Sequence, residues 1–134
     1  EELRDLQIIL DCDVIQADGG TRTASISGSF IALQLCIKNM LNKKIIKKNP
    51  IKEYIAAISC GIVNGEPLLD LDFEEDQGAE VDANFVITES GKLVEVQMTS
   101  EKELCDEGSF NAMLELAKLG ISEIIQKQKR TLSD

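Results

Sequence analysis

The spacing of apolar residues changes along the chain, and each regular stretch predicts an element. Residues 6–16 alternate between a more apolar face and one that carries Asp11 and Asp13, which predicts a strand with one better-buried face. From about Thr23 to Leu41 the apolar residues recur at helical spacing, which predicts a long helix. The first third of the sequence is therefore expected to form a strand that leads into a helix.

The remaining residues predict two hairpins followed by a second helix. Asn64-Gly65 is a strong signal for a tight turn between two strands, and Glu89-Ser90-Gly91 separates another pair. The expected elements are strands over 54–63, 68–74, 82–88 and 92–98, an amphipathic helix over 109–129 and a frayed polar tail over 130–134. This order predicts a single layered domain of the α/β (α+β) class over residues 1–134.

Length and composition narrow the class of protein. A chain of 134 residues with 43% hydrophobic residues is long enough for one packed domain. No apolar run approaches the length of a membrane span, and the first residues do not form a signal peptide, so we expect a soluble, cytoplasmic protein without a membrane partner. The four cysteines lie far apart and histidine is absent, which disfavours zinc sites and Cys-His catalysis. Buried reduced thiols are expected instead.

The glycine turn between the first strand and the first helix has the features of an anion site. Gly19-Gly20 breaks the strand just before the helix, so N–H groups at the helix start lack partners and the positive end of the helix dipole lies behind them. Thr21 adds a hydroxyl and Arg22 adds a planar set of donors, and phosphate is the favoured anion. The alternative is a simple connection in which Arg22 pairs with a nearby carboxylate.

Acidic residues dominate the charge of the chain and concentrate in one stretch. The net charge of −10 argues against a general nucleic-acid-binding protein, which is usually basic. Seven acids lie within thirteen residues: Asp70, Asp72, Glu74, Glu75, Asp76, Glu80 and Asp82. One interpretation is a solvent-facing acidic strand edge, with Asp70, Asp72 and Glu74 on one face. In the other, the irregular connection 77–80 lets Asp76 and Asp82 converge on one Mg²⁺ ion, because Mg²⁺ prefers oxygen ligands and keeps several waters.

Four stretches of the chain resemble a known family in order and spacing. They are residues 11–28 (DCDVIQADGGTRTASISG), 56–66 (AAISCGIVNGE), 70–84 (DLDFEEDQGAEVDAN) and 94–97 (VEVQ). Together they closely resemble the ribonuclease PH family of phosphorolytic nucleases, which trim tRNA 3′ ends. The resemblance covers essentially the whole chain, but only the second half of the family's protein.

The resemblance implies a fold, an assembly and a set of site residues. The fold is a mixed β-sheet with helices packed on one face, related to ribosomal protein S5 domain 2, and the domain is truncated on its N-terminal side. The implied assembly is a homo-oligomeric, hexameric ring, with RNA-gripping arginines in the preceding half that offset the acidity here. Asp76 and Asp82 are implied as the catalytic and metal-binding pair, and Gly20, Thr21 and Arg22 as the phosphate-binding residues.

The implied activity is that of a phosphate-dependent 3′-to-5′ exoribonuclease acting on the 3′ end of tRNA precursors. Inorganic phosphate is the co-substrate, attacks the terminal phosphodiester and releases a nucleoside 5′-diphosphate, with Mg²⁺ as cofactor. The expected catalytic residues are Arg22, Asp76 and Asp82. No histidine base is required, because phosphate is already an anion at neutral pH.

Two other functions stay open at this point. The chain can be a catalytically inactive truncated or split-gene product, or a ring-scaffold subunit that binds RNA or partners without cleaving. It can also be a binder of small nucleotides that uses the same anion site. Met98 stands where the family usually has glycine, and residues 102–106 also depart from the family pattern, so local packing is expected to differ there.

Overall fold

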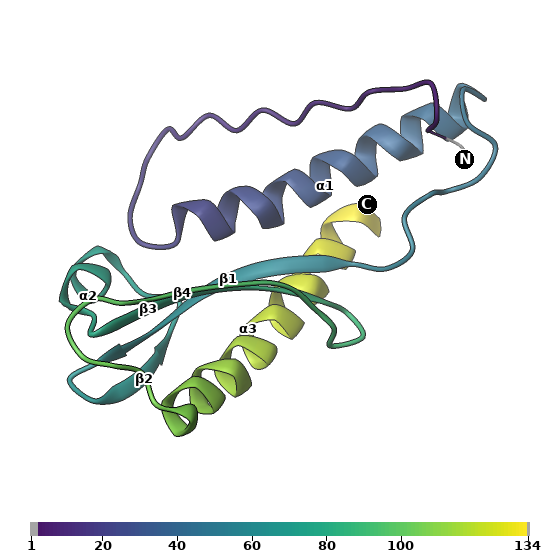
Figure 1. Ribbon diagram of the computed structural model, residues 1–134. Coiled ribbons are helices and arrows are strands. Elements are labelled where there is room, and N and C mark those ends of the chain that lie inside the picture. The colour runs from purple at the N-terminus through teal and green to yellow at the C-terminus, as the bar shows by residue number, and fades with distance from the viewer. Residues whose placement is uncertain (1–2, 134) are drawn as a thin grey trace.

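The computed structural model describes residues 3–133, which form an antiparallel β-sheet between two long helices (Figure 1). The elements in chain order are α1 (Thr21–Asn42), β1 (Ile55–Val63), β2 (Glu66–Leu69), α2 (Phe73–Gly78), β3 (Val81–Thr88), β4 (Leu93–Ser100) and α3 (Glu107–Ser133). The strand order in the four-stranded sheet is β2-β1-β3-β4. The predicted α+β class is confirmed.

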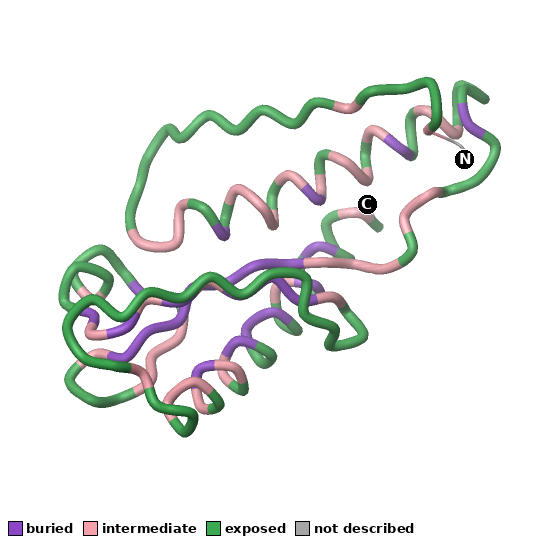
Figure 2. The backbone as a smooth tube through the Cα atoms, viewed as in Figure 1, coloured by how far each residue is buried: buried purple, intermediate pink, exposed green. Residues whose placement is uncertain are grey.

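Strand β1 is covered on both faces. It is buried without interruption from Ala56 to Ile62, because α1 packs on one face of the sheet and α3 on the other (Figures 1 and 2). The main core lies between the sheet and α3, and comprises Ala56, Ile58, Cys60, Ile62, Val81, Ala83, Phe85, Ile87, Met113, Ala117, Ile121 and Ile125. The predicted mixed sheet with helices on one face is therefore corrected: the strand pairs within residues 3–133 are all antiparallel, and the helices lie on opposite faces.

The predicted strand over residues 6–16 is not a strand in the structure. This segment is extended but runs along α1 on the side away from the sheet, and it is largely exposed (Figures 1 and 2). Ile9 is 78% exposed and Ile15 is 98% exposed. A strand needs a neighbour to satisfy its backbone groups, and α1 separates this segment from the strands in the described part of the chain.

Element ends differ from the predictions where capping groups decide them. The turn at Asn64-Gly65 is confirmed, since both residues adopt positive φ and join β1 to β2. The second strand ends at Leu69 rather than at residue 74, because Asp72 caps a short helix. Helix α3 runs four residues past the predicted end, so the tail expected to fray at 130–134 is helical through Ser133, and residue 134 lies outside the described residues.

Helix α1 is, by length and composition, long and apolar enough to cross a membrane, contrary to the expectation that no such run exists. Core helices of water-soluble domains meet the same criterion, and α1 uses its apolar stripe to cover β1. Its buried residues are Thr23, Phe30 and Ile37, and the Phe30 ring lies 5.3 Å from the ring of Tyr54. Packing on the sheet accounts for these buried residues, while other apolar residues of α1, such as Leu35, are exposed.

A buried amide joins the two long helices to the edge of β1. Gln128 of α3 is only 2% exposed, and its Nε2 donates to the carbonyl oxygens of Ser27 (3.0 Å) and Ile55 (3.1 Å). The Ser27 hydroxyl in turn bonds both the N–H and the carbonyl of Ala57. Strand β2 is too short to reach this part of β1, so side chains from the helices satisfy the β1 backbone instead.

Replacing Gln128 by leucine is expected to lower the free energy of unfolding by about 1–3 kcal/mol, because two half-buried carbonyls lose a donor. Urea denaturation followed by circular dichroism measures this loss. Gln126→Leu on an exposed position of the same helix is the matched control and should change stability by no more than about 0.5 kcal/mol. Equal stability of the two variants would show that the Gln128 amide does not hold the helices to β1.

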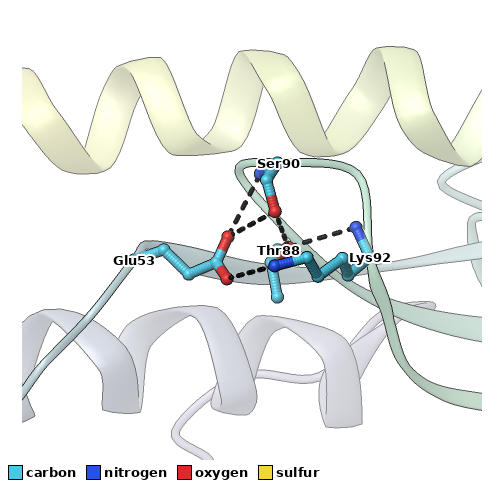
Figure 3. A network of polar contacts seen from close by, with 4 residues as sticks. All are labelled: Glu53, Thr88, Ser90 and Lys92. Atoms are coloured by element: carbon cyan, nitrogen blue, oxygen red, sulfur yellow. Dashed lines mark hydrogen bonds and ion pairs between the residues drawn. The ribbon is translucent and has the colours of Figure 1, made fainter.

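The β3–β4 turn is fastened to the start of β1 by a polar network (Figure 3). Glu53 accepts hydrogen bonds from the N–H and the hydroxyl of Ser90, and lies 3.7 Å from the Lys92 ammonium. Thr88 contacts the Ser90 hydroxyl and accepts from the Lys92 N–H. Hydrogen bonds from Ser90, then Thr88, lower the pKa of Glu53. This network fixes the end of the sheet opposite the acidic helix α2.

Candidate phosphate and metal site

The start of α1 presents unpaired backbone donors. Gly20 takes the left-handed conformation (φ 67°) at the N-cap position and provides no side-chain cap. The N–H groups of Thr21, Arg22 and Thr23 have no acceptor among residues 3–133. The two threonine hydroxyls donate backward, from Thr21 to the Asp18 carbonyl and from Thr23 to the Gly20 carbonyl. The unpaired backbone donors that the sequence predicts at this turn are therefore present, and their role in binding an anion stays a prediction.

Below this helix start, the sheet carries a polar row that crosses three strands. Ser59 of β1 lies opposite Asn84 of β3, which lies opposite Gln97 of β4. In the next row, Gly61 lies opposite Asp82. Residues paired in this way share one face of a sheet, and this face is the one turned toward α1. Asp82 is thereby placed on the α1 side of the sheet, near the glycine turn.

A single carboxylate joins the glycine turn to α2. Asp18 Oδ1 accepts from the N–H of Gly19 (3.0 Å) and from the N–H of Phe73 (2.8 Å), which is the first residue of α2. Helix α2 is further fixed by a capping box in which Asp72 and Glu75 each accept from the other's N–H. Because α2 carries Asp76, the acidic residue and the anion-binding turn are held in one unit.

All five predicted site residues line one cavity of about 200 Å³. The lining residues are Asp18, Gly20, Thr21, Arg22, Ser59, Asp76, Asp82 and Asn84. A liquid water takes about 30 Å³, so this volume holds a phosphate ion together with a few waters. The structure thus brings together Gly20, Thr21 and Arg22 with Asp76 and Asp82, while their roles stay predictions.

Three lining residues were not anticipated from the sequence. Ser59 lies within an apolar strand that is buried on both faces, so no alternation marks it as facing a site. Asn84 follows Asp82 by two residues on β3, a spacing that places both side chains on one face and was available as a signal. Asp18 directly precedes the glycine turn, where aspartate commonly bonds the backbone.

Charge in the cavity is unbalanced. Arg22 is the one cationic side chain among the lining residues, against three carboxylates. Its guanidinium also donates to Glu95 of β4 at 2.7 Å, so the alternative expectation that Arg22 pairs with a nearby carboxylate is met as well. Burial first, then the charges of Asp76 and Glu101, raise the pKa of Asp82. An added cation would relieve this repulsion.

The acidic stretch does not form the strand face that was one of its interpretations. Asp72 caps α2 and Glu74 lies inside that helix, while Asp70 adopts positive φ (59°) between β2 and α2. Within the described residues, no group of three or more histidine, cysteine or acidic side chains is placed to hold a metal ion. Asp76 and Asp82 therefore offer two oxygen ligands, and a Mg²⁺ ion bound there would take the rest from water and substrate.

The cysteines do not contribute a metal site or a disulfide. All four are free thiols in the structure. Cys60 is buried in the core, and burial together with Asp70 and Asp82 raises its pKa to about 12, so its thiol is inert at neutral pH. Cys12 is exposed, which corrects the expectation that the thiols are buried. Cys12 lies in the segment 6–16, which does not pair with any strand of the sheet.

Replacing Gly19 by alanine is expected to lower the free energy of unfolding by about 3 kcal/mol or more. A Cβ at this position would lie 1.8 Å from the Leu71 carbonyl oxygen, so the backbone before α2 would have to move away from the turn. Gly28→Ala in α1 is the matched control, since nothing lies within 4 Å of its added Cβ, and it should stabilise by about 0.5–1 kcal/mol. Similar stability of both variants, measured by urea denaturation, would contradict the close packing of the turn on α2.

The chain is similar in sequence to known nucleases. Residues 53–120 match the model of the 3′ exoribonuclease family, domain 2. Ribonuclease PH of Methylocella silvestris is 53% identical over 131 residues, covering 98% of this chain and 55% of that protein. Ribonuclease PH of Neisseria meningitidis serogroup C is 50% identical over 133 residues, covering 99% of this chain and 55% of that protein. The chain spans about half the length of the curated relatives it matches.

Solved structures resemble the chain in fold. Rice (Oryza sativa) Rrp46 matches with a TM-score of 0.70 at 23% identity, over 90% of this chain and 51% of that chain. An archaeal exosome core matches with a TM-score of 0.65 at 18% identity, over 86% of this chain and 47% of that chain.

Proposed function

Since the chain belongs to the 3′ exoribonuclease family, we propose that it carries the phosphate and metal site of a phosphorolytic exoribonuclease. The proposed substrate is the 3′ end of a tRNA precursor, shortened one nucleotide at a time with release of nucleoside 5′-diphosphates. The observation that carries this proposal is the single cavity that joins the donors at the start of α1 to Asp76 and Asp82. The names of the similar relatives support the same reaction class.

In the proposed reaction, inorganic phosphate accepts hydrogen bonds from the free N–H groups at the start of α1 and contacts Arg22. One of its oxygens forms a bond to the phosphorus of the terminal phosphodiester, and the bond from that phosphorus to the 3′ oxygen breaks. The departing 3′ oxygen takes the proton that the attacking hydrogen phosphate gives up, which leaves a shortened RNA and a nucleoside 5′-diphosphate. The N–H donors fix the attacking anion in place, so the protein's contribution is orientation and charge stabilisation.

Magnesium is the cation that we assign to Asp76 and Asp82. Burial, and then the charge of Asp76, raises the pKa of Asp82, and Asn84 lines the same cavity; two carboxylates in such a place suit a hard cation that keeps most of its waters. When bound, the ion would offset the negative charge of the transferring phosphoryl group. The excess of carboxylates supports this assignment, because without a cation phosphate would enter a cavity whose charged side chains are mainly negative.

The test is a phosphorolysis assay on a 3′-extended tRNA, performed with the protein that contains this chain. Shortened RNA and nucleoside 5′-diphosphates are expected, and both should need phosphate and Mg²⁺. Release of nucleoside monophosphates without phosphate would show hydrolysis and reject the proposed reaction. Tight binding of free nucleotides without any effect on RNA would instead favour a nucleotide-binding protein.

A non-catalytic ring subunit is the second candidate, and the fold that the chain shares with rice Rrp46 and an archaeal exosome core supports it. The relatives named ribonuclease PH are nearly twice as long, so residues that complete their activity need not lie in this chain. We propose a ring-shaped homo-oligomer, a hexamer, for either candidate. Exposed apolar residues on β4, among them Val94 (57%) and Met98 (40%), provide surface for such contacts. Native mass spectrometry tests the assembly, and an assembled ring without phosphorolysis would favour the scaffold.

A further inference from the structure

The hydroxyl of Ser59 is a buried polar group that the proposed reaction leaves unused. Ser59 is 4% exposed, and its Oγ has no hydrogen-bond partner among the residues that the structure describes. Buried hydroxyls in proteins normally have a partner, and an unmet one costs stability. Ser59 also lines the cavity that holds Arg22, Asp76 and Asp82, so its missing partner is expected inside that cavity.

The position of Ser59 places this hydroxyl directly below the anion-binding turn. A Cβ added to Gly20 would lie 3.4 Å from Ser59 Oγ, so the backbone of the turn passes close above the serine. The strand around Ser59 is fixed, because its carbonyl accepts from the Asp70 N–H at 2.8 Å and it lies opposite Asn84 in the sheet. Ser59 therefore lies on the sheet side of the cavity, with its hydroxyl close beneath the turn, while the free N–H groups lie on the α1 side.

We propose that Ser59 is a further phosphate-binding residue, whose hydroxyl donates a hydrogen bond to the anion held at the start of α1. This inference rests on the proposed function. A neutral donor suits this position, since a second cationic side chain would pair with Asp76 or Asp82 rather than with phosphate. The bound anion would thus contact donors on two sides, backbone N–H groups and Arg22 above and the serine hydroxyl below.

A phosphate-binding role and a purely structural role of Ser59 predict different effects of replacing it by alanine. If Ser59 had only a structural role, its hydroxyl would make a hydrogen bond within the protein, and removing that hydroxyl would destabilise the fold. The Ser59 hydroxyl has no such partner among the described residues. Ser59→Ala is therefore expected to leave the melting temperature unchanged or to raise it, while phosphate affinity falls. The loss should be about 10- to 100-fold, the size expected for one hydrogen bond to a charged group.

The experiment is calorimetric titration of inorganic phosphate, with Mg²⁺ present, into the protein that contains this chain and into four variants. Ser59→Ala should bind phosphate weakly, Ser59→Thr should recover most of the affinity because it keeps the donor, and Arg22→Ala should also bind weakly. Ser122→Ala, an exposed serine on α3, is the control and should bind as the unmodified protein does. Thermal melting of each variant accompanies the titrations.

The outcomes distinguish the two proposals. Full phosphate affinity in Ser59→Ala, with affinity lost in Arg22→Ala, would overturn the role of Ser59 and leave the proposed function intact. Full affinity in both variants would overturn the role of Ser59 and the phosphate site together. A change in Mg²⁺ affinity alone in Ser59→Ala would place the hydroxyl on a metal-bound water and would also overturn the proposal.

Discussion

Replacing Arg22 by alanine is expected to reduce kcat/KM for phosphate by about 10²- to 10³-fold while the fold stays intact. Arg22 is the one cationic side chain that lines the cavity, and removing a charged donor from an oxyanion site commonly has an effect of this size. Its side chain is about half exposed, and its partner Glu95 is also on the surface, so little stability depends on the ion pair. Steady-state phosphorolysis with varied phosphate measures the loss.

Two control variants sharpen this result. Glu95→Gln removes the carboxylate that holds Arg22 at 2.7 Å and should leave phosphate affinity equal or higher, because the guanidinium then has one less competing anion. Arg22→Lys keeps the charge but not the planar set of donors, and should recover only part of the activity. Unchanged phosphorolysis in Arg22→Ala would remove Arg22 from the site.

Replacing Asp82 by asparagine is expected to reduce activity by about 10³-fold and to raise stability at neutral pH. The first effect follows from the loss of one of two proposed Mg²⁺ ligands. The second follows from the raised pKa of Asp82, since burial and Asp76 disfavour its charged form. Phosphorolysis over a range of Mg²⁺ concentrations and thermal melting of the same samples measure both effects.

The raised pKa of Asp82 also determines how its contribution to stability changes with pH. With a raised folded-state pKa, the folded chain holds the Asp82 proton more tightly than the unfolded chain does. The contribution of Asp82 to stability is therefore greatest below its ordinary pKa near 4 and is lost as the pH rises through the raised value. Asp82→Asn should remove this loss, so the variant gains most above that range.

Asp106 provides a control of opposite sign. It accepts from the Ser109 N–H at 2.7 Å at the start of α3, and that bond lowers its pKa. Asp106→Asn should therefore weaken the protein at neutral pH, and the difference should shrink as the pH falls through the lowered pKa. If Asp82→Asn and Asp106→Asn shifted stability in the same direction, the electrostatic origin assigned to the Asp82 effect would be wrong.

How far the fold could be predicted depended on whether local signals agreed with tertiary packing. The long helix after Thr21 and the turn at Asn64-Gly65 follow from periodicity and turn chemistry, which are local properties. The short helix α2 was missed because its acidic run resembled a strand edge, although Asp72 and Glu75 have the spacing of a capping box. The segment 6–16 has a strand's pattern without a strand's neighbour, which sequence alone does not reveal.

The site residues that lie next to one another in the sequence were the ones that could be predicted from local signals. Gly20, Thr21 and Arg22 are adjacent in sequence, so their convergence needs only a helix start. Asp76 and Asp82 come from a helix and a strand, and the resemblance to a family rather than any periodicity brought them into the prediction. Ser59 was missed because β1 is apolar on both faces, so its neighbours give no hint that one side chain faces a cavity.

The link made by Asp18 has a consequence for how ligands bind. One carboxylate oxygen accepts from Gly19 and from Phe73, residues more than fifty positions apart, and so ties the glycine turn to α2. The two parts of the site are thereby preorganised, and an arriving anion need not pay to assemble them. Ligand-free and phosphate-bound forms should accordingly superimpose closely around the turn.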